Sequence, residues 1–356
     1  MRLIYLDQSI LSAMFGGGDE LTPEFRNLSQ TLCFKLVLLK ARHRVNVIVS
    51  DIHSRETAAI PDEHGEKRVR IWNAMNQFAD GRIADPWIDV FVAQQRRRLT
   101  DTGQSNAFPL SDIGIPDRDT EARSSAMVIS TNEWRLRLHK MDANDRNAIN
   151  AHLRGIYIRQ KESVAMVSHP EATVSVIRNA WKKELTLAIA AFRFHQKKHQ
   201  KMLYDQMLSD GFSYPPPDII DHPFKGVVKL LVRDGDEELA LTRLEEQIER
   251  EEFCAALELR ISLEAQMLLK TKGGKHIRDL KRFNREYGLS MQNDIDYVSA
   301  FVPYCDVITV DKGMGTLCEG EIAKSALSKY PCTIMLNNNL AQLDAWLDSL
   351  DSEVVE

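Results

Sequence analysis

Two aspartates in this chain each follow a short apolar run that has the character of a β-strand. Asp7 comes directly after LIYL, and Asp311 comes directly after DVITV. In an open parallel sheet, ligands bind beyond the carboxyl ends of the strands, so both carboxylates are placed where binding and catalysis usually occur. A single aspartate there is more often a helix cap or a turn residue. The occurrence of two, one near each end of the chain, favours a shared site.

Three further acidic residues belong to predicted helices near these strands. Glu56 lies in SDIHSRETA, after the strand-like run VNVIV, and Asp294 and Asp296 begin the apolar segment NDIDYVSAF. The alternative interpretation is structural, with Glu56 as an exposed helical residue, Asp294 as an N-cap and Asp296 as a first-turn acid. Carboxylates that converge on one crevice repel one another and require a divalent cation. Oxygen ligands favour Mg²⁺ or Mn²⁺ over zinc.

These acids lie in segments that resemble a known family. YLDQS, VSDIHSRET and NDIDYVSAF followed by DVITVD are similar to the acidic motifs of PIN-like domains, in the same order. The motifs are short, and the resemblance covers only the two ends of the chain. It implies that Thr309 is the threonine of the family's T-x-D pattern, and that Ser9 and Thr309 bind phosphate or support a carboxylate. The catalytic acids that it implies are Asp7, Glu56, Asp294 and Asp311.

The resemblance implies a metal-dependent nuclease, most often an endoribonuclease, that hydrolyses phosphodiester bonds with Mg²⁺ or Mn²⁺. RNA is the expected substrate, with single-stranded DNA as an alternative. Asp7, Asp294 and Asp311 would hold metal, and Glu56 would bind metal or orient the attacking water. Asp296 competes with Asp294 as the third acidic metal ligand. The alternative function is a catalytically silent PIN-like module that binds RNA or assembles with proteins.

Such a site needs a sheet that joins the two ends of the chain. Strand-like runs alternate with helical segments at both ends, which indicates parallel strands connected by helices. The predicted strands are Leu3–Leu6, Val45–Val49, Asp306–Val310 and Cys332–Leu336. The predicted helices nearest to the site and at the C-terminus are Pro23 to about Ala41, Asp294–Val302, Glu319–Ser328 and Leu340–Leu350.

The middle of the chain has a different character. Strand-like runs nearly vanish there, and the sets Trp181, Leu185, Ile189, Phe192 and Phe253, Leu257, Ile261, Ala265, Leu268 recur at the spacing of a buried helix face. The predicted fold is α/β, a PIN-like three-layer α/β/α domain with a central parallel sheet that is discontinuous in sequence. Residues 1–64 and 285–356 form its two parts, and residues 65–284 form a large, mainly α-helical insertion.

Two basic clusters are candidates for contact with substrate phosphates: Arg96, Arg97 and Arg98, and Lys197, Lys198 and Lys201. Such runs are usually solvated faces, although neutralisation of the backbone is how polyanions are held. His195 and His199 lie four residues apart beside the second cluster. No HExxH glutamate accompanies them, which disfavours a zinc site.

Composition excludes several other classes. The 356 residues are 44% hydrophobic and carry a formal net charge of −5, which fits a globular protein without an overall basic character. Five cysteines include no CxxC pair, which argues against a disulfide framework and favours a reducing cytoplasm. GxxxxGK[ST] and GxGxxG motifs are absent. A haloacid-dehalogenase-type phosphatase needs a second acid where this chain has Ser9.

The expected partners follow from these features. No signal peptide and no run of about 18 apolar residues is present in the sequence, so no membrane association is expected. RNA is the expected macromolecular ligand. The size of the helical insertion, and its place between Glu56 and Asp294, lead us to expect that it restricts access to the site or binds a protein inhibitor or partner.

Overall fold

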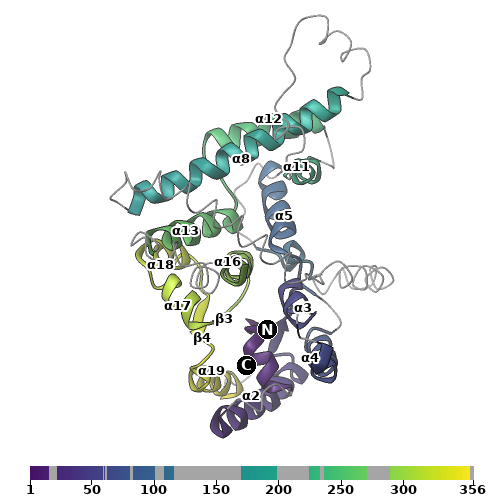
Figure 1. Ribbon diagram of the computed structural model, residues 1–356, viewed down its shortest axis with the longest axis vertical. Helices are drawn as coiled ribbons and strands as arrows, with labels where there is room; N and C mark the ends of the chain where they lie inside the picture. Colours follow the sequence, from purple (N-terminus) through teal and green to yellow (C-terminus); the bar gives the residue numbers. More distant parts are fainter. Residues whose placement is uncertain are drawn as a thin grey trace, which may run out of the picture.

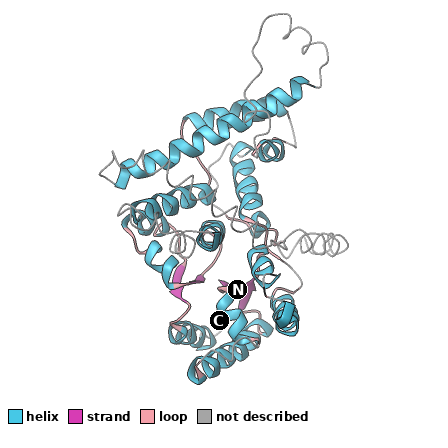
Figure 2. Ribbon diagram, in the orientation of Figure 1, coloured by secondary structure: helices cyan, strands magenta, loops and turns pink. Residues whose placement is uncertain are grey.

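The computed structural model describes residues 1–15, 22–58, 60, 62–80, 83–100, 108–115, 170–198, 224–232, 236–270 and 289–352, with the backbone alone at 55, 62, 194–198 and 289. Helices form most of this part of the chain, and four short strands form one sheet (Figure 2). Among the described residues, no helix combines the length and the apolar character that crossing a bilayer requires.

The four strands are parallel and lie in the order β2-β1-β3-β4. Their bounds are β1 Arg2–Tyr5, β2 Val45–Ile48, β3 Val307–Val310 and β4 Thr333–Leu336. The N-terminal strand pairs with the C-terminal part of the chain, since Ile4 lies opposite Val307 and Tyr5 lies opposite Ile308. The predicted parallel sheet, built from both ends of the chain, is therefore confirmed. Parallel pairing also places the carboxyl ends of all four strands at one edge.

Both faces of the sheet are buried, because successive side chains of a strand point to opposite sides. In β1, Tyr5 enters one hydrophobic core and Ile4 enters the other. The helices on the Ile4 face are α1 Gln8–Met14, α2 Pro23–Ala41, α4 Gly65–Phe78 and α19 Leu340–Ser352. The helices on the Tyr5 face are α3 Asp51–Ala58, α5 Trp87–Thr100, α13 Ala255–Lys270, α16 Leu289–Phe301, α17 Lys312–Cys318 and α18 Glu321–Leu327.

Two helices beside the site differ from the sequence-based expectation. The helix expected to begin at Asp294 begins at Leu289, because Met291 extends the buried stripe of Ile295 and Val298 by one more turn. No helix was expected directly after Asp311, yet α17 begins there. Two glycines in KGMGTLC concealed α17, and one of them, Gly315, lies so close to the end of the Leu336 side chain on β4 that a Cβ would require that side chain to move.

The helices from the middle of the chain share a core with the sheet. In addition to α4, α5 and α13, they comprise α8 Pro170–Lys198, α11 Lys225–Leu231 and α12 Glu237–Glu249, with short 3-10 turns at Asp62–His64 and Leu110–Ile113. Figure 1 shows α8 and α12 at one end of the molecule, α2 and α19 at the other, and α13 beside α16. Leu185 and Leu257, from the two predicted stripes, are buried in the same cluster as Tyr5. Because α4 packs on the Ile4 face, the helical layers that cover the sheet include residues beyond 64, where the helical insertion was expected to begin.

Candidate functional site

Asp7 lies at the carboxyl end of β1, where it caps α1. Its side chain accepts a hydrogen bond from the backbone N–H of Ser9 at 2.8 Å, and another from the Ser9 hydroxyl. Its own backbone N–H donates to Oγ1 of Thr309 at 2.6 Å. The carboxylate is thus held by the first turn of α1, and its backbone is tied to the neighbouring strand β3.

Asp311 occupies the matching place at the end of β3. Its side chain accepts a hydrogen bond from the backbone N–H of Met314 at 2.6 Å and caps α17. Because β1 and β3 are adjacent parallel strands, Asp7 and Asp311 lie at the same edge of the sheet. Both are helix caps, as the structural interpretation of the sequence expected, and both are also neighbours at the edge where ligands bind.

Asp294 projects from the interior of α16 and is 7% exposed. Burial of its carboxyl group raises the pKa of Asp294 well above the usual value. The negative charges of Asp311, Asp7 and Glu56 raise this pKa further, in that order. These three carboxylates, from two strand ends and one helix, therefore act on the same buried acid.

Glu56 is half-buried on α3, the helix that follows β2. Burial raises the pKa of the Tyr5 hydroxyl well above its usual range, and a hydrogen bond with Ser50 acts in the opposite direction. The charges of Glu56, Asp51 and Asp7 add to the upward shift, which places all three near the end of β1. Asp51 was not selected from the sequence, although it stands two residues after the VNVIV run.

Asp296 turns away from this group of acids. Residues two apart on an α-helix point in nearly opposite directions, and Asp296 forms an ion pair with Arg260 of α13. Its charge is the last of the four that raise the pKa of Asp294. Of the two residues that competed as the third acid, the structure brings Asp294 to the strand ends and pairs Asp296 with a cation.

Asn337 joins the site although sequence reasoning missed it. It follows β4, and its amide donates to Oγ of Ser9 at 2.9 Å and to Oδ1 of Asp7 at 3.4 Å. Its backbone N–H continues the sheet by donating to the carbonyl of Val310 at 2.8 Å. The strand-end rule that selected two aspartates, applied to polar residues in general, would have found it.

Thr309 and His53 are both buried, and each hydrogen-bonds with backbone groups at the same edge of the sheet. Thr309 is 1% exposed and also receives a hydrogen bond at its carbonyl from the hydroxyl of Tyr297, at 3.4 Å. Nδ1 of His53 accepts from the backbone N–H of Ser50 at 3.0 Å, so Nε2 donates to the carbonyl of Leu6 at 2.7 Å. Backbone groups thus engage both ring nitrogens of His53, which hydrogen-bonds within the fold.

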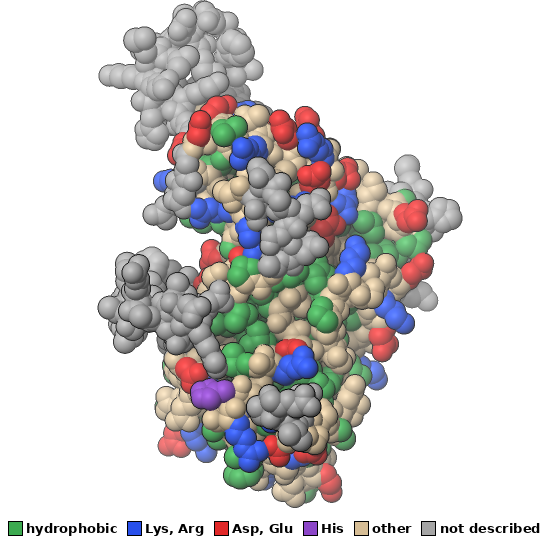
Figure 3. Space-filling model, turned by 180° about the vertical axis from the view of Figure 1, so that it is seen from behind, with side chains coloured by type: hydrophobic (Ala, Val, Ile, Leu, Met, Phe, Trp, Pro, Cys, Tyr) green, Lys and Arg blue, Asp and Glu red, His purple; other side chains and the backbone are tan. Residues whose placement is uncertain are grey.

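The first predicted basic cluster lies on α5, and Lys197 and Lys198 of the second are the last two residues of α8. Arg97 pairs with the buried carboxylate of Asp112 at 2.6 Å, Arg96 is half-buried and Arg98 is exposed. The side chains of Lys197 and Lys198 and all of Lys201 lie outside the described residues, as do the side chain of His195 and all of His199. On the face in Figure 3, basic and acidic side chains are interspersed with apolar surface.

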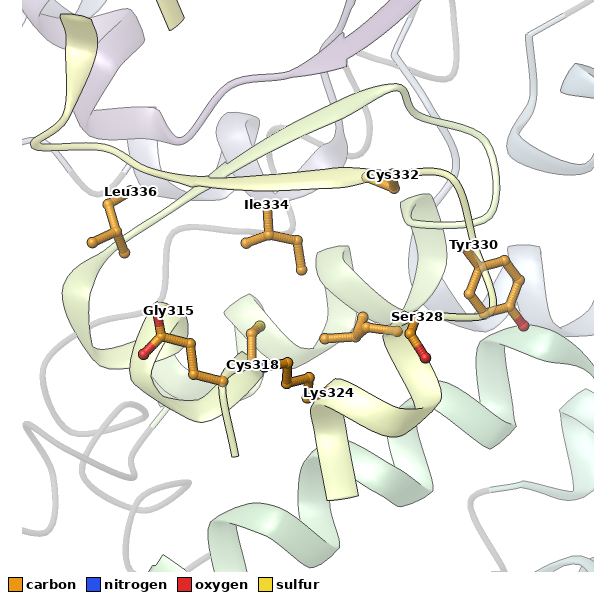
Figure 4. A pocket seen from close by; sticks show the side chains of 10 residues that line it. Gly315, Cys318, Lys324, Ser328, Tyr330, Cys332, Ile334 and Leu336 are labelled. Atoms are coloured by element: carbon orange, nitrogen blue, oxygen red, sulfur yellow. The ribbon is translucent and has the colours of Figure 1, made fainter. Parts of the chain in front are cut away.

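A cavity of about 250 Å³ lies between β4, α17 and α18 (Figure 4). Its lining combines Cys318, Lys324, Ser328, Tyr330 and Cys332 with apolar side chains. None of the candidate acids lines it. The acids therefore select the carboxyl edge of the sheet, and not this cavity, as the candidate site.

A divalent cation fits the acids in donor type and in charge. Hard carboxylate oxygens suit Mg²⁺ or Mn²⁺, and a cation would offset the charges of Asp311, Asp7 and Glu56 that act on the buried Asp294. Ligand spacing is a separate matter. Within the described ranges, no three His, Cys, Asp or Glu side chains are placed to hold a metal ion together. Binding therefore requires side-chain rotation, which the half-buried positions of Asp7, Glu56 and Asp311 allow.

Comparison with known proteins adds no relative: no family model, no curated protein and no solved structure matches this chain.

Proposed function

We propose that this protein is a metal-dependent phosphodiester hydrolase, and specifically an endoribonuclease of the PIN-like kind. The observation that carries the proposal is the meeting of Asp7 and Asp311 at the ends of adjacent parallel strands, with Asp294 buried beside them. Glu56 reaches the same place from α3. The order of these acids along the chain is the order of the motifs in the family that they resemble.

The residues take distinct parts in this reaction. Asp7, Asp294 and Asp311 hold the cation, and Glu56 binds it or orients the attacking water. Bound Mg²⁺ or Mn²⁺ supplies charge to the scissile phosphate and a water of lowered pKa. Ser9 and Asn337 place a hydroxyl and an amide beside Asp7, where they orient this carboxylate or donate to a phosphate oxygen.

RNA is the proposed substrate, and single-stranded DNA is the alternative. A single strand is proposed because Asp7, Glu56 and Asp311 are half-buried, and the backbone of a single strand can approach them more closely than that of a wider duplex. Arg98 is the exposed member of the cluster on α5, and a backbone phosphate is the ligand that we propose for it. We also propose that the helices of residues 65–284 bind a protein inhibitor or partner.

The test is incubation of the purified chain with pooled RNA and with single-stranded DNA, in Mg²⁺ and in Mn²⁺. Asp7→Asn and Asp311→Asn are expected to abolish cleavage. Asp80→Asn is the matched control, because Asp80 is an exposed acid whose partner is Lys40 near the end of α2. Cleavage that survives both site substitutions overturns the proposal.

A second candidate function is a silent module that binds RNA or assembles with proteins. The observation in its favour is that the described acids are not at ligand spacing. Titration calorimetry with Mn²⁺ separates the two functions. A nuclease requires binding that Asp7→Asn weakens, whereas RNA binding without dependence on a metal supports the silent module.

A further inference from the structure

Arg260 of α13 is surrounded by partners from two helices. Its Nε donates to Oε1 of Glu264 at 2.8 Å, one Nη forms the ion pair with Asp296, and the other donates to Oε1 of Gln292 at 3.4 Å. The side chain is only 13% exposed. A guanidinium presents its donors in a fixed fork, so these contacts define one orientation of the group.

Two neighbouring tryptophans, whose ring centres are 5.7 Å apart, also contact the guanidinium. Its carbon lies 4.3 Å from the ring centre of Trp87 on α5, and 5.4 Å from that of Trp181 on α8. Trp181 in turn donates to Oε2 of Glu264 at 2.9 Å. Cation–π contact with both rings and the shared carboxylate join α5, α8, α13 and α16 at one charged group.

The contacts on α16 set the rotation of that helix. Gln292 and Asp296 are four residues apart and face α13 together, whereas Asp294 faces the strand ends. Rotation of α16 about its axis would remove Asp294 from Asp7 and Asp311. The same rotation would separate the nearly buried guanidinium from Asp296 and Gln292 and leave Glu264 as its remaining acidic partner, which is unfavourable.

We infer that Arg260 is a positioning residue of the acidic site, which acts through Asp296 and Gln292 to hold α16 so that Asp294 faces the strand ends. The inference rests on the proposed function and assigns a task to the helices between residues 65 and 284. They provide the support against which one of the acids is oriented.

The experiment compares Arg260→Gln with the full wild-type chain by Mn²⁺ titration calorimetry and by hydrogen exchange of the α16 amides. Loss of a residue that orients a metal ligand typically weakens metal affinity by about 10- to 100-fold. We expect at least a tenfold weaker affinity and faster exchange over residues 289–301. Arg260→Lys keeps the charge without the fork, so it is expected to give an intermediate affinity.

Arg178→Gln is the matched control. Arg178 of α8 donates to both carboxylate oxygens of Glu258 on α13, at 2.6 and 2.7 Å, and lies 5.8 Å from the ring centre of Phe253. This arginine therefore has the same kind of ion pair and ring contact between helices, without a contact to α16. Its loss is expected to leave the Mn²⁺ affinity and the α16 exchange unchanged.

Each outcome decides the matter. Wild-type Mn²⁺ affinity in Arg260→Gln overturns the inference, and so does an equal loss of affinity in Arg178→Gln. If Arg260→Gln does not fold, Arg260→Lys replaces it, and wild-type affinity in that variant overturns the inference. If the wild-type chain shows no Mn²⁺ binding that Asp7→Asn weakens, the proposed function is overturned as well. If that binding is present and Arg260→Gln leaves it unchanged, only the role of Arg260 is overturned, so the two failures are distinguishable.

Discussion

His53 links the ends of β1 and β2 from inside the core. One ring nitrogen bonds the Ser50 N–H after β2, and the other bonds the Leu6 carbonyl after β1. Burial lowers the pKa of His53 from 6.5 to about 4, against smaller opposing effects of the Leu6 carbonyl and of Asp7. The neutral ring is therefore the native form. In the unfolded chain the ring binds a proton at a higher pH than it does in the folded protein.

This difference predicts a dependence of stability on pH. The contribution is complete above about pH 6.5 and is lost as the pH falls toward 4, because the unfolded state then binds the extra proton. Between pH 7 and 5 we expect a loss on the order of 2 kcal/mol in the free energy of unfolding, at about 1.4 kcal/mol per pKa unit. Urea titrations measure it. His53→Gln should lack this part of the slope, the exposed His64→Gln should keep it, and equal slopes in all three would refute the assignment.

Asn337 allows a second prediction at the scale of one residue. Its amide contacts both Ser9 and Asp7, so its loss removes one polar donor from the site and leaves the Asp7 carboxylate with its bonds to Ser9. We expect Asn337→Ala to weaken Mn²⁺ binding by roughly tenfold, as measured by calorimetry, while urea unfolding changes little. The neighbouring exposed Asn338→Ala is the control. Unchanged affinity in Asn337→Ala would remove this residue from the site.

The pairing of β1 with β3 is short. Ile4 and Tyr5 lie opposite Val307 and Ile308, and the backbone N–H of Asp306 donates to the carbonyl of Leu3 at 2.8 Å. The bond from the Asp7 N–H to the Thr309 hydroxyl extends this contact beyond the last strand residue of β1. Thr309 thus connects the end of one acid-bearing strand to the other. Its hydroxyl lies at the same edge of the sheet as both aspartates and accepts the bond from the Asp7 N–H.

Thr309→Val tests this link between elements. Valine keeps the shape of threonine and removes the acceptor, which leaves the Asp7 N–H without its partner at a cost of about 1–3 kcal/mol. Urea unfolding should show that loss, and Thr309→Ser should recover most of it. Thr333→Val, at an exposed position of β4, is the control. Stability equal to wild type would mean that water replaces the hydroxyl.

At the scale of the whole molecule, helices of the middle segment pack on both faces of the sheet. Tyr5 and Ile308 of the sheet belong to the same buried cluster as Phe91 of α5 and Leu257 of α13. α4, on the opposite face, places Ile71 and Met75 in the second cluster. The chain between residues 65 and 284 therefore contributes to both layers around the sheet.

A chain in which residue 64 is joined to residue 285 is consequently expected not to fold cooperatively. Each large apolar side chain that loses its cover costs about 1.5–3 kcal/mol, and the total stability of a domain is only about 5–15 kcal/mol. Loss of the near-ultraviolet circular dichroism signal and of a sharp urea transition would show it. A cooperative transition in the shortened chain would show that residues 65–284 are an independent insertion.

The sequence by itself determined the features that depend on neighbouring residues. Apolar runs identified the four strands within one or two residues, and Thr22 with Pro23 marked the start of α2. The strand-end positions of Asp7 and Asp311 were equally visible. Local preference failed at α17, where Gly315 serves a close approach to Leu336 that no neighbour in the sequence reveals.

Only the tertiary structure decided which side chains meet. The bonds from Asp7 to Thr309 and from Asn337 to Asp7 join residues more than 300 positions apart, and strand pairing alone brings them together. The choice between Asp294 and Asp296 depends on the rotation of α16, which a cation on α13 sets. A pattern of residue types records which face of a helix is apolar, whereas the partner of each polar residue depends on packing across the whole chain.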